Sequence, residues 1–326
     1  MRDQNYDLID LFKLIMSVGV VSIHIGVPGL KTIGRLAVPY FLIVSSYLFF
    51  IKYKTLDDNG KKKKIRKFCK RIILLFISWE IFYLPWAISD GINFFSEKGI
   101  TIFSFMSYIW ELIFYRNSLT GWGASWYLFA LVWGLPVFCL AIKKFGIKNV
   151  GIISVAIEIY YIVTSGYLRN ADIYHVIAPS FFVRIFIYLL IGYIIANWNI
   201  YLKPSLGCVI GISIIFLLEN IFLWKIVSGI SNGEEVITTT IASSIIFLYT
   251  LKNSVEIPHA ITLRHLSTFI YCGHMLMMKI YPYYNFGDSK LVELLVVLVE
   301  CCLIYFVWNF FYQRSSRSKF IFKYMI

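Results

Sequence analysis

Residues 8–26 read LIDLFKLIMSVGVVSIHIG, an apolar run whose only ionisable side chains are Asp10, Lys13 and His24. One helix across the hydrocarbon core of a bilayer needs about 20 residues of this character. Similar runs recur along the whole chain, so we predict an all-α, polytopic integral membrane bundle of about ten transmembrane helices. We expect one transmembrane domain over residues 1–326. The predicted spans lie near 8–26, 36–53, 72–89, 124–142, 149–165, 180–197, 205–227, 236–251, 265–282 and 290–312.

The composition agrees with this prediction and excludes most soluble classes. Hydrophobic residues make up 59% of the 326 residues and charged residues only 15%, whereas a soluble domain has about 25% charged residues. A disordered chain, a secreted disulfide scaffold and a nucleic-acid-binding domain are therefore excluded, and no nucleic-acid partner is expected. No small-residue cleavage site follows the first run, which we interpret as a retained helix rather than a signal peptide.

Two smaller features complete this outline. The segment 100–115 is apolar but short and carries Glu111, which is typical of an interfacial or re-entrant piece. Five of the six cysteines lie inside apolar runs, and none shows the spacing of a metal site. We therefore expect buried thiols, no metal site and no bound cofactor.

Lys and Arg residues are unevenly divided between the segments that connect the spans. With a cytoplasmic N-terminus, the cytoplasmic segments hold 21 of the 31 Lys and Arg residues, and the outer segments hold 6. Positive residues gather on the cytoplasmic side of a membrane, so we predict that both termini are cytoplasmic. The basic segment 54–71 contributes most to this bias. It can attract the phosphates of a ligand, or it can set the orientation and contact anionic lipid, which is the favoured interpretation.

Lys13 and His24 share one face of the first helix. Eleven residue steps place them about 16 Å apart along the axis and about 20° past three full turns. Lys13 lies near the predicted cytoplasmic end and His24 lies deep, toward the outer leaflet. Imidazole can take a proton near neutral pH, so His24 is the better catalytic candidate. The structural alternative is that a neighbouring helix satisfies His24, while Lys13 snorkels or pairs with Asp10.

The second span contains two adjacent serines. Pro39 is a favourable first residue for this helix, and Ser45 and Ser46 permit close contact between helices. Either serine would need a nearby base to act as a nucleophile. Packing is therefore the favoured interpretation.

Several motifs follow one another along nearly the whole chain. The first is Asp10-Leu11-Phe12-Lys13, with His24 after ten further residues. The others are Val38–Leu48, the basic segment 54–71, Ser125–Leu131, Arg184–Tyr193 and Ser267–His274. In this order they resemble the membrane acyltransferase family called acyltransferase 3; no single motif is specific to that family, but the ordered set is.

Three positions depart from the usual pattern of the family. Lys13 stands in place of the more common Arg, which keeps the charge but loses the bidentate fork. Ser46 replaces a glycine, which we expect to remove a close backbone approach. Met275 replaces a proline that often follows the late histidine.

The resemblance implies acyl transfer in a multi-pass protein of the bacterial plasma membrane, surrounded by membrane lipids. The donor substrate is cytoplasmic acyl-CoA, usually acetyl-CoA. The acceptor is a hydroxyl group on a cell-envelope glycan or a lipid-linked sugar. Some relatives carry an extracytoplasmic SGNH-type esterase domain, whereas this chain is expected to be the stand-alone form.

The candidate catalytic residues are His24, Lys13 and His274, and the candidate substrate-binding residues are Arg184, Trp126, Tyr127 and Ser45. The resemblance implies that His24 is the base or a transient acyl carrier, and that His274 is a second proton-transfer group. Lys13 and Arg184 would hold donor phosphates or polarise the donor carbonyl. Trp126 and Tyr127 would line a sugar site, although interface anchoring is the favoured interpretation for both.

Other interpretations remain at this point. His274 can be a polar residue satisfied within the bundle. A transporter or flippase for a polysaccharide or lipid-linked precursor would also carry intramembrane charges, which would line a pathway. The carboxyl groups of Glu80, Glu158, Glu219 and Glu300 also fall within spans, and the sequence assigns no role to them.

We predict that reporter fusions placed after residues 60 and 326 both report a cytoplasmic location, because of the charge bias. Paired reporters that are active on opposite sides of the membrane make the measurement. An outside signal at either site would contradict the topology and, with it, access of the protein to cytoplasmic acyl-CoA.

Overall fold

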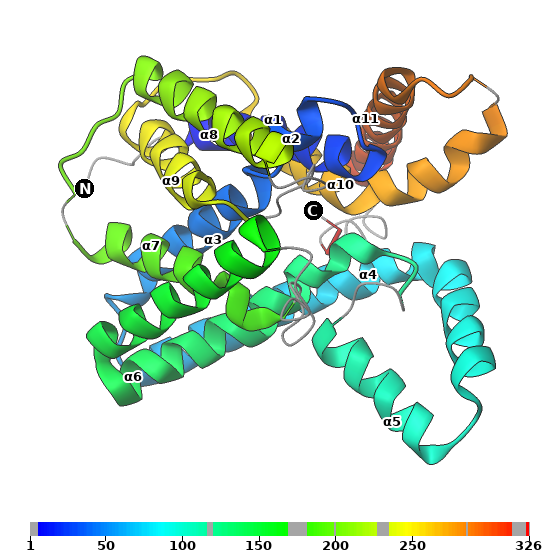
Figure 1. The fold of residues 1–326 in the computed structure, drawn as a ribbon, viewed down its shortest axis with the longest axis horizontal. Helices are drawn as coiled ribbons and strands as arrows, with labels where there is room; N and C mark the ends of the chain where they lie inside the picture. The colour runs from blue at the N-terminus through cyan, green and yellow to red at the C-terminus, as the bar shows by residue number, and fades with distance from the viewer. Residues whose placement is uncertain are drawn as a thin grey trace.

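The computed structural model describes residues 6–115, 120–168, 181–198, 200–226, 235–284, 286–314 and 324–325, and these ranges contain helices and no strand (Figure 1). The α-helices are α1 (Asp7–Ile25), α2 (Leu30–Gly34), α3 (Ala37–Tyr53), α4 (Asp58–Lys98), α5 (Ile102–Trp110), α6 (Trp126–Tyr161), α7 (Phe186–Asn197), α8 (Leu206–Ile226), α9 (Ile237–Lys252), α10 (Ala260–Ile280) and α11 (Lys290–Arg314).

The helices confirm the predicted class of membrane bundle. Helical structure covers nearly all of each predicted span. The exceptions are Gly26, Leu36, Phe181, Ser205 and Val236, at or near span ends, and residues 180 and 227, which lie outside the described ranges. Among the described residues, six helical stretches are long and apolar enough to cross a membrane. One of them, Gly123–Tyr167, contains two predicted spans, because Gly146 inside α6 has non-helical angles (φ 75°, ψ 160°) and the chain reverses there (Figure 1). The number of crossings and their orientation stay predictions.

A short helix that the sequence does not predict joins the first two spans. Gly26 and Gly29 have positive φ angles of 81° and 76°, which glycine adopts without steric cost. They turn the chain so that α2 packs back along α1. A Cβ atom on Gly34 would lie 2.3 Å from the carbonyl oxygen of Gly19, so the two backbones are in direct contact. As a result, α3 begins beside the middle of α1 rather than beside its end.

The basic segment 54–71, which the sequence places between two spans, is mostly helical. α4 begins at Asp58, and the Asp57 carboxylate caps it by accepting a hydrogen bond of 2.9 Å from the Gly60 amide. Lys and Arg are good helix formers, and the cap satisfies a free backbone donor at this end. The basic residues therefore form the first turns of a 41-residue helix.

The second half of α4 turns away from the bundle, and α5 returns beside it (Figure 1). Pro85 lies inside α4, and proline removes one backbone hydrogen bond from a helix interior. The segment 100–115 is thus a separate helix, which begins with a capping box formed by Thr101 and Ser104. An apolar groove of about 880 Å³ lies between the two helices, lined by residues that include Leu84, Ile88 and Phe105.

Two helix pairs form the centre of the bundle, α1 with α10 and α3 with α7. In the second pair, Ser46 is fully buried and its hydroxyl donates to the Leu189 carbonyl oxygen at 2.7 Å. The expectation that Ser46 removes a close backbone approach is wrong, because Gly192 supplies the space on the opposite helix. A Cβ atom on Gly192 would lie 2.4 Å from the Ser46 Cβ and 2.8 Å from the Ile43 carbonyl oxygen.

We predict that Gly192→Ala destabilises the bundle by about 1–3 kcal/mol, the typical cost of inserting a methyl group into a packed interface. Thermal unfolding of the purified protein in detergent makes the measurement. Gly211→Ala in α8 is the matched control, because a Cβ atom there meets nothing within 4 Å. Equal unfolding temperatures for the two variants would show that α3 and α7 can separate without cost.

Candidate active site

The two histidines of the predicted site are neighbours. His24 lies in the last turn of α1, and His274 lies in the second half of α10. Their ring centroids are 5.1 Å apart, with an interplanar angle of 38°. His24 is exposed, whereas His274 is fully buried at 0% exposure. The structure therefore places an accessible imidazole beside a buried one, although the two histidines are 250 residues apart in the sequence.

The backbone of α10 determines which ring nitrogen of His274 carries the proton. Nδ1 lies 3.0 Å from the Ile270 carbonyl oxygen and 2.9 Å from that of Tyr271. Both atoms are acceptors, so we assign the hydrogen to Nδ1. Nε2 then keeps a lone pair, and it has no hydrogen-bond partner within the described ranges. Charging a fully buried imidazole costs free energy, which favours a neutral His274 that accepts a hydrogen bond through Nε2.

A row of aromatic side chains connects the histidine pair to Ser45. The ring of Tyr271 lies 6.4 Å from that of His274 and 5.5 Å from that of Tyr127. The Tyr127 hydroxyl is 3.2 Å from Ser45 Oγ, within hydrogen-bond distance. Three predicted site residues, Ser45, Tyr127 and His274, thus gather in one region. The hydrogen-bond partner of Ser45 there is a tyrosine, not a histidine base, which agrees with a packing or binding role.

Lys13 lies in a second cluster, toward the beginning of α1. Asp10 is 2% exposed, and its carboxylate accepts from Lys13 Nζ at 3.2 Å and from Arg264 Nε and Nη2 at 3.0 and 2.9 Å. Arg71 of α4 acts electrostatically on both Lys13 and Tyr127. The ion pair that the structural alternative predicts for Lys13 is therefore present. Even so, two cations bond to one buried carboxylate and a third, Arg71, acts on Lys13, and the excess positive charge favours an anion.

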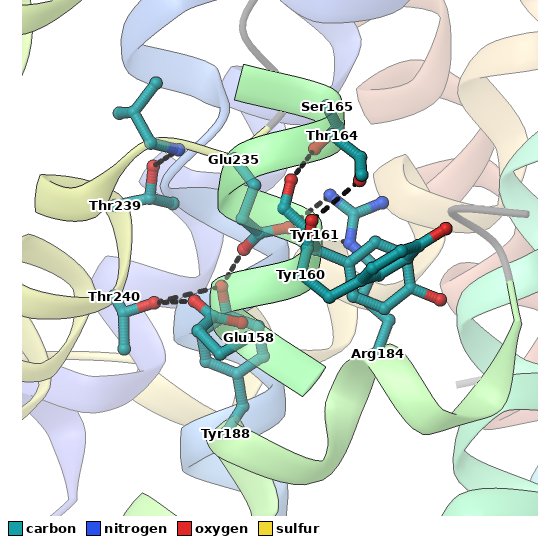
Figure 2. A network of polar contacts seen from close by, with 11 residues as sticks. Glu158, Tyr160, Tyr161, Thr164, Ser165, Arg184, Tyr188, Glu235, Thr239 and Thr240 are labelled. Carbon is teal, nitrogen blue, oxygen red and sulfur yellow. Dashed lines mark hydrogen bonds and ion pairs between the residues drawn. The ribbon is translucent and has the colours of Figure 1, made fainter. Parts of the chain in front are cut away.

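Arg184 lies in a third cluster, which Figure 2 shows. Its Nε and Nη2 donate to one oxygen of Glu235 at 2.7 and 2.5 Å, and Glu235 is 1% exposed. The guanidinium also lies over the rings of Trp126 and Tyr161, 5.6 and 5.9 Å from their centroids. The structure thus brings Arg184 and Trp126 together, and a carboxylate neutralises the arginine.

Two further side chains extend this cluster. The Tyr188 hydroxyl donates to the other oxygen of Glu235, and the Thr240 hydroxyl donates to Glu158 (Figure 2). These bonds connect α6 to the start of α9, and α7 to Glu235, two residues before α9. Of the other acids with no predicted role, Glu219 accepts from the Tyr167 and Thr238 hydroxyls, and Glu300 accepts from the Tyr284 hydroxyl.

Arg184 and Lys13 lie in opposite halves of the bundle. α3 and α7 run parallel, because Ser46 bonds to Leu189 and Lys54, at the end of α3, donates to the Ala196 carbonyl oxygen at 2.6 Å. α3 begins beside Gly19 of α1 and runs antiparallel to α1. Arg184 lies just before α7, so it is at the same end of the bundle as the start of α3. This is the end at which α1 finishes and His24 lies. One ligand group cannot contact both cations.

Sequence reasoning missed two charged residues of these clusters. Glu235 lies one residue before a predicted span. An arginine inside the membrane, such as Arg184, requires an acidic partner, and this requirement could have prompted a search for Glu235. Arg35 is predicted to be an outer connecting residue, yet the return of α2 brings it close enough to act electrostatically on His24. Within the described ranges, no group of three His, Cys, Asp or Glu side chains could hold a metal ion.

Comparison with known proteins agrees with the motif order. A family model described as an acyltransferase domain, of the acyltransferase 3 family, matches residues 6–312. The chain matches no curated protein and no solved structure. The matched region includes all three clusters of charged and aromatic side chains. The chain is therefore a multi-pass membrane protein that belongs to the acyltransferase 3 family.

Proposed function

We propose that this acyltransferase moves an acetyl group from cytoplasmic acyl-CoA to a hydroxyl of a cell-envelope glycan or lipid-linked sugar. We place it in the bacterial plasma membrane, with the cytoplasm on the side where α1 begins. The observation that carries the proposal is the contact between an exposed His24 and a buried, hydrogen-bonded His274. General bases in enzymes are commonly oriented by a second polar group in this way.

The donor binds at the cluster of Lys13, Arg264 and Arg71. Phosphate oxygens interact strongly with Lys and Arg, and this cluster has more cations than carboxylates. The basic first turns of α4 on the same side draw the anionic donor to the membrane and contact anionic lipid headgroups. From Lys13 to His24 is about 16 Å along α1. The phosphates therefore bind near one end of the helix, and the thioester extends toward the other.

The acceptor hydroxyl reacts at His24. In the reacting complex, we propose that an N–H group of His24 turns to donate to His274 Nε2, which has no hydrogen-bond partner within the described ranges. The other His24 nitrogen is then the base. That nitrogen takes the hydroxyl proton while the hydroxyl oxygen bonds to the thioester carbon. The bond between carbon and sulfur then breaks, and the CoA thiolate takes the proton. Arg35 beside His24 stabilises the negative oxygen that develops on the carbonyl group.

The cluster around Arg184 belongs to the acceptor side. Trp126 and Tyr161 provide aromatic surfaces of the kind that suits a sugar, and Tyr127 and Ser45 provide hydroxyl groups closer to the histidines. Because Glu235 neutralises Arg184, the cluster suits a hydroxyl-rich ligand better than a phosphate. Mass spectrometry of the envelope glycans, with and without the protein, identifies the acceptor.

We predict that His24→Ala lowers the rate of acyl transfer by about 10²–10⁴-fold, the usual contribution of a general base. Acceptor-dependent release of free thiol from acetyl-CoA by the purified protein makes the measurement. His259→Asn is the control, because His259 is exposed, lies outside the three clusters and has a positive φ of 59° that asparagine tolerates.

Two outcomes would contradict this proposal. Near wild-type turnover of His24→Ala would show that His24 is structural. If the wild-type protein releases no thiol with any glycan or lipid-linked acceptor, the transporter or flippase interpretation gains support.

We predict that Lys13→Arg keeps activity and that Lys13→Ala loses most of it, because a cation of either shape can meet the donor phosphates. The loss appears as a raised KM for acyl-CoA or as a lost binding signal in calorimetry. The rival explanation is that Lys13 only neutralises Asp10, with which it pairs at 3.2 Å. The double variant Asp10→Asn, Lys13→Ala separates the two explanations. If the double variant binds acyl-CoA like wild type, Lys13 has no donor role.

A further inference from the structure

The hydroxyl of Tyr83, on α4, is inserted into the hydrogen-bond ladder of α10. It donates to the Cys272 carbonyl oxygen at 2.8 Å and accepts from the Leu276 amide at 2.9 Å. These two backbone groups are four residues apart, so in a regular α-helix they bond to each other. In α10 both groups bond to the tyrosine oxygen.

The turn that Tyr83 bridges is the one that carries His274. Insertion of a side chain into the ladder is a recognised cause of local helix distortion. His274 is midway between Cys272 and Leu276, and its Nδ1 is bound to the carbonyl oxygens of the preceding turn. The backbone around Tyr83 Oη therefore controls where the imidazole lies relative to His24.

Aromatic packing holds Tyr83 rigidly in this position. Tyr83 and Trp122 are both fully buried, and their rings stack 5.2 Å apart at 7°. Trp122 stacks in turn on Phe76, at 5.9 Å and 5°. One helical turn from Tyr83, the ring of Trp79 approaches α10 so closely that a Cβ atom on Gly273 would lie 3.0 Å from it. The α4 helix thus packs an inflexible aromatic face against the His274 turn.

We propose that Tyr83 is a positioning residue for acyl transfer: its hydroxyl keeps the His274 turn open and so holds the imidazole against His24. This inference rests on the proposed role of the histidine pair. The hydrogen bonds of Tyr83 go to the α10 backbone and its ring stacks on Trp122, not on either histidine, and it is fully buried. Its effect must therefore fall on the chemical step and not on substrate binding.

Tyr83→Phe removes the hydroxyl and keeps the ring stack. The Cys272 carbonyl and the Leu276 amide can then bond directly, so no buried polar group is left unpaired and stability should change little. The closed turn moves His274, and a misplacement of about 1 Å can cost about 100-fold in rate. We expect kcat to fall by about 10–100-fold, while KM for acyl-CoA and for the acceptor stays at the wild-type value.

Tyr40→Phe is the matched control, because Tyr40 is also fully buried and its hydroxyl lies 3.2 Å from Thr250 Oγ1 and 3.5 Å from the Ile9 carbonyl oxygen, away from His274. Thermal unfolding and acyl-CoA calorimetry are measured on both variants. If Tyr83→Phe folds to lower yield than the control, kcat and KM are also measured on Trp122→Phe. This variant loosens the stack of aromatic rings that holds Tyr83, so kcat should fall by a smaller factor while KM stays constant.

The results have distinct meanings. A kcat of Tyr83→Phe within twofold of wild type overturns the positioning role. A loss of donor binding or of unfolding temperature beyond that of Tyr40→Phe also overturns it, because Tyr83 is then only structural. His274→Ala in the same assay tests the proposed function separately. If His274→Ala turns over like wild type, the role of the histidine pair fails; if it is inactive and Tyr83→Phe is fully active, only the positioning role fails.

Discussion

The buried carboxylate of Asp10 fixes the register between α1 and α10, and the active-site geometry depends on that register. Asp10 accepts hydrogen bonds from Lys13 on its own helix and from Arg264 on α10. An isolated carboxylate inside a membrane protein is costly, so these bonds tolerate little displacement. From Asp10 to His24 is about 21 Å along α1, and from Arg264 to His274 about 15 Å along α10. The long side chain of Arg264 spans the difference, and the two imidazoles meet.

The same constraint explains how the charged groups are divided through the bundle. Lys13 and Arg264 share Asp10 in one half, and Arg184 is bonded to Glu235 in the other. Between these ionic clusters lie hydroxyl and aromatic groups, including Ser45, Tyr127 and Tyr271. The proposed anionic donor and the proposed hydroxylated acceptor would therefore meet different electrostatic environments.

The sequence predicted much of the fold because hydrophobic length is a local property. Helices cover nearly all of each of the ten spans, and His24 and His274 were identified from motif order. It could not predict which distant helices pair. The contact of His24 with His274, the choice of Glu235 for Arg184 and the return of α2 that brings Arg35 inward depend on packing between segments far apart in the chain. Ser46 illustrates this limit of prediction from sequence, because its close packing depends on Gly192, which lies on another helix.

The buried pair of Arg184 and Glu235 also constrains how the sequence can change. Loss of either partner leaves the other charge buried and alone, at a cost of about 3–5 kcal/mol, whereas replacement of both by apolar residues can be neutral. Replacing both residues by successive single substitutions therefore passes through a variant that keeps only one of the two charges, and the stability of this variant is greatly lowered. Selection should therefore preserve or remove the two residues as a unit. Substitutions at positions 184 and 235 would be correlated over evolutionary time even in lineages where the acceptor has changed.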